Sequence, residues 1–142
     1  MSPSRSPFPS FCIAACLALA ACATPQAETP PANAPMVRGA LSGVRQQLNS
    51  FYNVNPDCTT GGYPTLKLAK APQHGQVSVE QGMAFADYPK DNIRSACNGR
   101  SVPATLIYYM SEPGYVGADS VAFDRIGVSG GYGYHDYMIN VR

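Results

Sequence analysis

The two histidines and their neighbours are the residues that most readily suggest acid–base or metal chemistry. His135 precedes Asp136 beside a glycine-rich segment, and such a pair could serve a small hydrolase. His74 or His135, together with methionines, could instead hold a metal ion. A zinc site needs further ligands, and the sequence shows no clustered set of His, Glu and Asp residues that would favour an enzyme. We therefore expect no catalytic residues, no cofactor and no bound metal, and we keep the hydrolase and the metal carrier as alternatives.

A glycine-rich segment with several tyrosines lies near the end of the chain. Residues Gly127 to Gly133 lack the Lys-Ser/Thr sequence of a phosphate-binding loop, so we interpret them as a flexible hairpin tip. Tyr132, Tyr134 and Tyr137 lie around this tip. Exposed tyrosines suit recognition because they combine an apolar ring with a polar hydroxyl group. We predict that Tyr132 and Tyr134 bind a partner, and the alternative is that Tyr137 and one other of these tyrosines are core residues.

The first 21 residues contain a short apolar stretch that leads into a cysteine. Arg5 supplies a basic start, residues 11–21 are apolar, and the stretch ends in Leu19-Ala20-Ala21-Cys22. A membrane-spanning helix needs about 20 apolar residues, whereas the apolar core of a secretory signal has roughly 7–15. The segment resembles a bacterial lipoprotein signal peptide with its lipobox, which implies cleavage before Cys22 and lipidation of that cysteine. The alternative is an ordinary signal peptide, cut near Ala21 or Ala23 without lipid.

Lipidation of Cys22 would determine where the protein is located. A protein with one acyl chain binds a membrane only marginally, whereas two or more acyl chains, of which palmitate is an example, anchor the protein stably. Residue 23 is alanine rather than aspartate. By resemblance to Gram-negative sorting rules, this favours the outer membrane, with the domain facing the periplasm. The first expected partner is therefore the lipid bilayer, bound through acylated Cys22.

The cysteines divide cleanly between these segments. Cys12 and Cys16 lie in the expected leader and Cys22 carries lipid, so Cys58 and Cys97 remain as a pair in an oxidising compartment. We predict a disulfide that closes a loop of about 40 residues, worth about 4 kcal/mol in the chain-entropy model. A redox pair or two metal thiolates are the alternatives, which the wide spacing without a Cys-x-x-Cys motif disfavours.

Composition excludes some classes of partner. The chain has 10 basic and 9 acidic residues, and loss of Arg5 with the leader would make the two numbers equal. Such a balance offers no basic patch for nucleic acid and no charge run for anionic lipid. Thirteen glycines, thirteen prolines and nine tyrosines against 13% charged residues indicate a turn-rich β protein. We therefore expect no nucleic-acid partner.

The chain divides into three parts. Residues 1–21 are the leader, residues 22–36 are the lipidated cysteine and a proline-rich linker, and residues 37–142 form one domain. Prolines bias the linker to polyproline II at about 3.1 Å per residue, so it could hold the domain roughly 40 Å from the bilayer.

Alternation of apolar and polar residues predicts the strands of the domain. Val37 to Leu48 has helical spacing, but Leu48 to Val54 alternates as a strand, and we favour a strand near Gln46 to Val54. A hairpin is expected around Pro72 and Gly75, and a long polar connection that includes Cys97 is expected between Gly82 and Val102. The other expected strands are Thr65–Lys70, Gln76–Glu80, the central strand Thr105–Met110, Ser120–Ile126 and Tyr134–Val141.

Two segments carry a resemblance to a known family. They are Ala71-Pro72-Gln73-His74-Gly75-Gln76-Val77 and the run from Tyr109 to Phe123, which reads YMSEPGYVGADSVAF. Together they resemble the P-x-x-G-x-V and Y-x-P-x-x-G-Y/F-x-G-x-D-x-F pattern of bacterial Ig-like and cadherin-like tandem-repeat domains. The chain also resembles small proteobacterial lipoproteins that keep a single such domain with a cysteine pair. The resemblance implies an Ig-like fold and leaves the ligand open.

The second segment has a physical interpretation. We expect a chain reversal at Pro113 in which Tyr115 buries its ring and Gly117 frees the backbone to turn. Asp119 would then accept backbone N–H bonds within the turn. The alternative for Asp119 is a calcium ligand, as in cadherins. Calcium takes six to eight oxygen ligands, and the sequence lacks an Asp-x-Asp run, so the structural role is favoured.

These observations predict an all-β, Ig-like antiparallel sandwich of about seven short strands. The function they favour is a membrane-tethered, non-enzymatic lipoprotein of the bacterial envelope that recognises an envelope protein or a glycan. A small periplasmic hydrolase and a metal-carrier lipoprotein are the alternatives.

Overall fold

A computed structural model describes residues 34–142. The predicted leader, the predicted lipidation site Cys22 and the linker up to residue 33 lie outside the described residues. Across residues 34–142, no helix has both the length and the apolar character that crossing a membrane requires.

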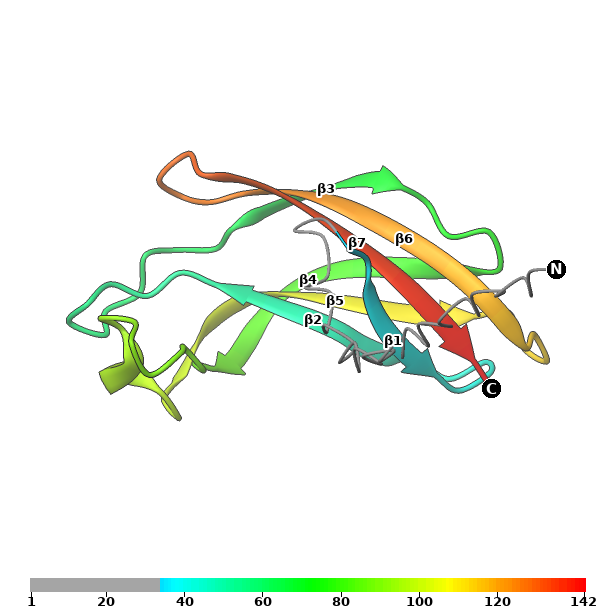
Figure 1. The fold of residues 1–142 in the computed structure, drawn as a ribbon, viewed down its shortest axis with the longest axis horizontal. Coiled ribbons are helices and arrows are strands. Elements are labelled where there is room, and N and C mark those ends of the chain that lie inside the picture. The colour runs from blue at the N-terminus through cyan, green and yellow to red at the C-terminus, as the bar shows by residue number, and fades with distance from the viewer. Residues whose placement is uncertain (1–33) are drawn as a thin grey trace, which may run out of the picture.

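Seven strands form two sheets packed face to face (Figure 1). One sheet has the order β1-β7-β6-β3 and the other has the order β2-β5-β4. The only helical element among the described residues is one turn of 3₁₀ helix, η1 (Ser95–Cys97). The strands are β1 (Met36–Ala40), β2 (Gln46–Tyr52), β3 (Thr65–Lys70), β4 (Gly75–Phe85), β5 (Ser101–Ser111), β6 (Gly117–Ile126) and β7 (Tyr132–Val141).

The arrangement confirms the predicted Ig-like β-sandwich. Strands two, five and four share one sheet, and strands three, six and seven share the other, as in an Ig constant-type domain. The first strand differs, because β1 lies parallel to β7 and joins the four-stranded sheet. The helical alternative for residues 37–48 is wrong, since they hold β1, a turn and the start of β2. Leu41 and Val44, which fit the helical spacing, are exposed in that turn.

The core lies between the sheets and follows the alternation of the strands. Tyr109 and Ile107 of β5 face Phe123 and Val121 of β6, and all four are fully buried. Tyr137 of β7 completes this layer, with its ring 6.5 Å from that of Phe123. The predicted central position of β5 is confirmed, because β2 and β4 flank it on its two sides.

The predicted hairpin around Pro72 and Gly75 is wrong. β3 pairs with β6 and β4 pairs with β5, so the segment between β3 and β4 crosses from one sheet to the other. Alternation and turn residues fit such a crossing as well as they fit a hairpin. Two backbone N–H groups of this crossing bond to Asp119 on β6, which fixes it against the four-stranded sheet.

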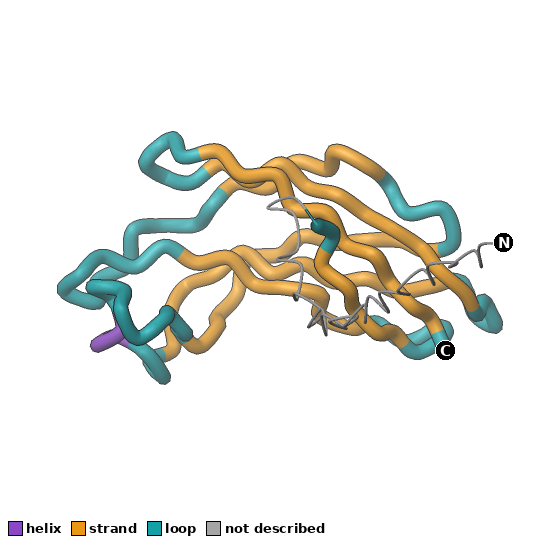
Figure 2. Tube along the Cα trace, in the orientation of Figure 1, coloured by secondary structure: helices purple, strands orange, loops and turns teal. Residues whose placement is uncertain are grey.

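The connection between β4 and β5 is shorter than predicted, because β4 continues to Phe85 and β5 begins at Ser101. The predicted disulfide is present between Cys58 and Cys97, with a Cα–Cα distance of 5.4 Å. It joins this connection to the segment after β2. Buried Val54, Ala86, Cys97 and Val102 form a second, smaller core cluster around it. Figure 2 shows that the connecting segments gather at the two ends of the sandwich.

Candidate functional site

The predicted tip is a tight β-hairpin. β6 and β7 pair from Gly117↔Val141 to Ile126↔Tyr132. The Gly127 N–H donates to the Gly131 carbonyl oxygen at 2.7 Å, and the Gly130 N–H donates to the Gly127 carbonyl oxygen at 2.9 Å. The loop therefore ends at Gly131, and Tyr132 already belongs to β7.

Tyr132 and Tyr134 present their rings to solvent on the outer face of the four-stranded sheet. Their side chains are 67% and 53% exposed, whereas Tyr137 is completely buried. This difference follows from strand parity, because residues 132 and 134 share one face and residue 137 lies on the other. The Tyr132 hydroxyl donates to Asp124 Oδ1 at 2.6 Å, and this hydrogen bond raises the pKa of Tyr132. Of the tyrosines near the tip, Tyr137 is the core residue.

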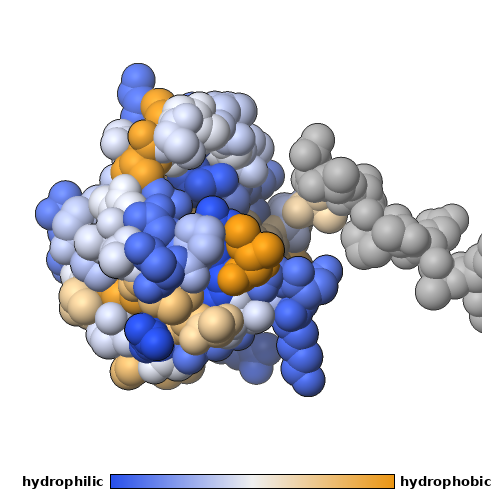
Figure 3. Space-filling view, turned by 90° about the vertical axis from the view of Figure 1, so that its left-hand side faces the viewer, coloured by the Kyte–Doolittle hydropathy of each residue, from blue (hydrophilic) through white to orange (hydrophobic). Residues whose placement is uncertain are grey.

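Two apolar residues that sequence reasoning missed accompany these tyrosines. Ile126 lies directly opposite Tyr132 across the hairpin, and Val128 lies in the loop. Both side chains are exposed. Figure 3 views this end of the molecule and shows apolar residues set among hydrophilic ones. Strand parity was the signal for Ile126, because its position opposite Tyr132 places it on the same outer face.

The inner side of the same hairpin carries a different set of groups. Arg125 Nε donates to His135 Nε2 at 3.3 Å, and the His135 ring lies 4.6 Å from the ring of Phe51 on the other sheet. Burial lowers the pKa of His135, and the charge of Arg125 lowers it further. Arg125, His135 and Phe51 together close this end of the core, and their arrangement favours the neutral form of the His135 imidazole.

The residues predicted for the alternative chemistries are not brought together. His135 and Asp136 are consecutive in β7, so their side chains project from opposite faces of the sheet. His74 lies in the β3–β4 crossing, at the opposite end of the sandwich from His135 (Figure 1). Within residues 34–142, no group of three or more His, Cys, Asp or Glu side chains is placed to hold a metal ion.

Asp119 is a buried structural residue that joins three segments. Its carboxylate accepts the N–H groups of Gln73 and His74 at 2.9 and 3.1 Å, and the hydroxyl of Tyr109 at 2.9 Å. The Ser120 N–H also donates to it at 2.8 Å. The prediction that its donors lie within its own turn is therefore wrong for all but Ser120. Burial alone would raise the pKa of Asp119, but these hydrogen bonds outweigh burial and hold the pKa below its ordinary value.

The other motif residues support the same end of the sandwich. The ring of Tyr115 packs against the core and stacks on His74 at 4.2 Å, and its hydroxyl donates to the Ala118 carbonyl oxygen. Gly117 has a φ of 146°, a conformation open mainly to glycine. A Cβ at Gly75 would lie 2.6 Å from the Met110 carbonyl oxygen, so only glycine fits there. Pro72 and Pro113 lie in the connections that these contacts hold.

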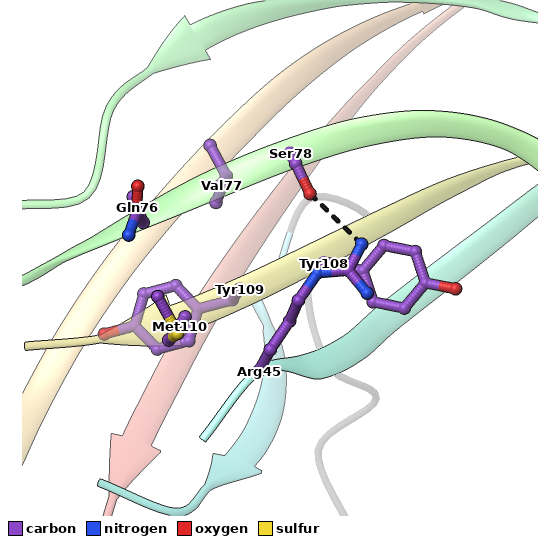
Figure 4. A pocket seen from close by; sticks show the side chains of 7 residues that line it. All are labelled: Arg45, Gln76, Val77, Ser78, Tyr108, Tyr109 and Met110. Carbon is purple, nitrogen blue, oxygen red and sulfur yellow. Dashed lines mark hydrogen bonds between the residues drawn. The ribbon is translucent and has the colours of Figure 1, made fainter. Parts of the chain in front are cut away.

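A hollow of about 210 Å³ lies on the outer face of the three-stranded sheet (Figure 4). The Arg45 guanidinium covers the Tyr108 ring at 3.5 Å from its centroid, pairs with Glu80 and donates to Ser78 Oγ at 3.4 Å. Gln76 and Met110 line the rest of the hollow. Sequence reasoning missed it because the turn before β2 brings Arg45 over β4 and β5, which no local pattern indicates.

These surfaces and contacts are the basis for a functional proposal. No protein-family model, no curated protein and no solved structure matches the chain.

Proposed function

We propose that this chain is a lipid-anchored, non-enzymatic binding module of the bacterial envelope. It recognises an envelope protein or a glycan through the outer face of the β6–β7 hairpin. The observation that carries this proposal is the pair of exposed rings at Tyr132 and Tyr134 on a hairpin whose strands pair without a bulge. A ring on a fixed strand offers a large contact area at a small cost in conformational entropy.

The surroundings of the two tyrosines support recognition at this place. Exposed Ile126 and Val128 extend the apolar surface around the tip. Asp124 orients the Tyr132 hydroxyl through its hydrogen bond, which leaves the ring face open. An apolar surface with polar groups at its rim is typical of interaction sites on loop ends of β-sandwiches.

The hollow beside Arg45 is a weaker candidate for the main binding site. Its volume of about 210 Å³ is below the roughly 300–1,000 Å³ of most small-molecule pockets. The Arg45 guanidinium already covers one face of Tyr108, and Glu80 already neutralises its charge. Stacking and charge pairing are therefore satisfied within the chain.

The binding proposal is tested by capture of a partner from envelope extract. The tagged protein with Tyr132→Ala and Tyr134→Ala is compared with the unaltered protein and with a Val116→Ala variant. Val116 is 68% exposed, close to the 67% of Tyr132, but it lies in the β5–β6 connection at the other end of the sandwich. We expect the double variant to fold normally and to lose most of the captured partner, while Val116→Ala captures it fully. Equal capture by all three proteins would mean that the hairpin is only a connector.

The anchor is tested separately, because binding and lipidation are independent parts of the proposal. Mass spectrometry of the membrane-extracted protein is expected to find an N-terminal Cys22 that carries acyl chains. A Cys22→Ser variant should leave the membrane fraction, because one covalent site holds all the acyl chains. Retention of that variant in the membrane at the unaltered level would contradict the lipid anchor and leave the binding proposal standing.

A further inference from the structure

β4 is a long edge strand whose second side has no partner strand among residues 34–142. It runs for 11 residues from Gly75 to Phe85 and pairs only with β5. Across the sandwich, the edge strand of the other sheet is β3, which has 6 residues. β4 therefore extends beyond the part of the other sheet that β3 provides.

The uncovered part of β4 exposes side chains that belong to its inner face. Val79, Met83 and Phe85 share the parity of Val77, which packs against the core. They are nevertheless 43%, 56% and 72% exposed. Leu68, on the facing strand β3, is exposed as well. The sandwich is thus open along this edge, and the opening is lined by apolar side chains.

β4 also lacks the features by which soluble proteins protect an edge strand. Such edges usually carry proline, lysine or an inward-pointing charge. The β4 sequence GQVSVEQGMAF has none of these. Its single charged residue, Glu80, points to the outer face and is paired with Arg45. An unprotected edge of this length is a template for pairing with another strand.

We propose that a second copy of this chain pairs with β4, antiparallel and about a two-fold axis at Gln81. In this register Gln81 faces Gln81, Val79 faces Met83 and Val77 faces Phe85. The apolar inner-face residues therefore meet apolar residues, and the two central amides can bond to each other. The two three-stranded sheets become one continuous sheet of six strands.

The sequence of the strand argues for this occupant and this register. On the outer face, Glu80 lies opposite Gly82 of the second copy, which leaves room for the Arg45–Glu80 pair. Because each Glu80 is neutralised by its own Arg45, the two-fold axis does not bring two unpaired carboxylates together. A two-fold axis at Gly82 would instead place Gln81 against Met83. A closed two-fold contact needs such a self-complementary surface.

A single cysteine at Gln81 tests both the partner and the register. In the proposed dimer the two Gln81 side chains lie directly opposite, where Cβ atoms are about 4.5–5.5 Å apart, so full-length Gln81→Cys should form a disulfide-linked dimer. Val116→Cys, at an exposed site away from the edge, is the control and should stay monomeric. Val79→Cys alone should cross-link poorly, whereas Val79→Cys combined with Met83→Cys should cross-link well.

A second measurement does not depend on cysteine chemistry. Light scattering on the Cys22→Ser protein, which carries no acyl chains that could associate and keeps its Cys58–Cys97 bond, should show a mass that rises to twice the monomer value with concentration. Val79→Lys should shift this equilibrium at least tenfold toward monomer without changing the circular dichroism of the fold. The proposal is overturned if Gln81→Cys cross-links no better than Val116→Cys. It is also overturned if mass spectrometry finds Gln81→Cys joined to a different protein, or if Val79→Lys leaves the dimer unchanged.

Discussion

Replacement of Asp119 should be the most destabilising single change in the polar part of the fold. The Asp119→Ala variant removes the acceptor of the buried Tyr109 hydroxyl and of the Gln73 and His74 N–H groups. A buried donor left without an acceptor costs about 1–3 kcal/mol. The two N–H groups are only partly buried, so water can reach them and their cost is about 1 kcal/mol each. The expected loss of unfolding free energy is therefore about 3–5 kcal/mol.

Two matched variants separate the contributions to this loss. Tyr109→Phe removes the hydroxyl and keeps the carboxylate with its N–H donors, so it should cost about 1 kcal/mol. Asp124→Ala removes another β6 carboxylate, one that bonds only to the exposed Tyr132 hydroxyl among the described residues. Asp124→Ala should change the unfolding free energy by no more than about 0.5 kcal/mol. Urea denaturation of the oxidised protein at pH 7 measures all three variants.

The same carboxylate makes stability depend on pH in a defined direction. Because hydrogen bonds lower the folded-state pKa of Asp119, its contribution is fully present above its unfolded pKa of about 3.9. The contribution is lost as pH falls through the lower, folded-state value. The gap between the unaltered protein and Asp119→Ala should therefore narrow below about pH 4. A gap of less than about 1 kcal/mol at pH 7, or a gap that widens toward pH 3, would refute this reasoning.

Local patterns were sufficient to predict most strands and the faces of their residues. β7 was predicted because its apolar residues alternate with polar ones. β5 was predicted because apolar residues fill both of its faces, as expected of a central strand. Parity also separates buried Tyr137 from exposed Tyr132 and Tyr134, since the first shares its face with Ile139 and Val141. The disulfide followed from the count of cysteines that remain after the leader. These features depend on residues close in sequence or on simple elimination.

Features that depend on contacts distant in sequence could not be predicted. Whether Pro72 to Gly75 closes a hairpin or crosses between sheets depends on Asp119, which accepts N–H groups 45 and 46 residues earlier in the chain. The exposure of Phe85 depends on the shorter length of β3 on the facing sheet. The alternation of residues along β3 and β4 assigns their side chains correctly to the inner and outer faces. It carries no information about which strand of the other sheet lies opposite.

The remaining predictions concern the Cys58–Cys97 disulfide at one end of the sandwich and the close packing of Gly75 at the other. Replacement of both Cys58 and Cys97 by alanine should lower the unfolding free energy by about 2–5 kcal/mol, measured by urea denaturation, and reduction of the unaltered protein should give the same loss. Gly75→Ala should cost about 1–3 kcal/mol, as overpacking does. At that position the new Cβ would lie 2.6 Å from the Met110 carbonyl oxygen and 2.7 Å from the Tyr109 ring, both of them in β5. β5 is the central strand, so neither group can move without disturbing its pairing with β2 or β4. Gly131→Ala is the matched control, because its Cβ would meet nothing within 4 Å, and thermal denaturation should find its midpoint close to that of the unaltered protein. Equal midpoints for the two alanine variants would show that the β4–β5 ladder can open at Gly75 without cost, contrary to the close packing described above.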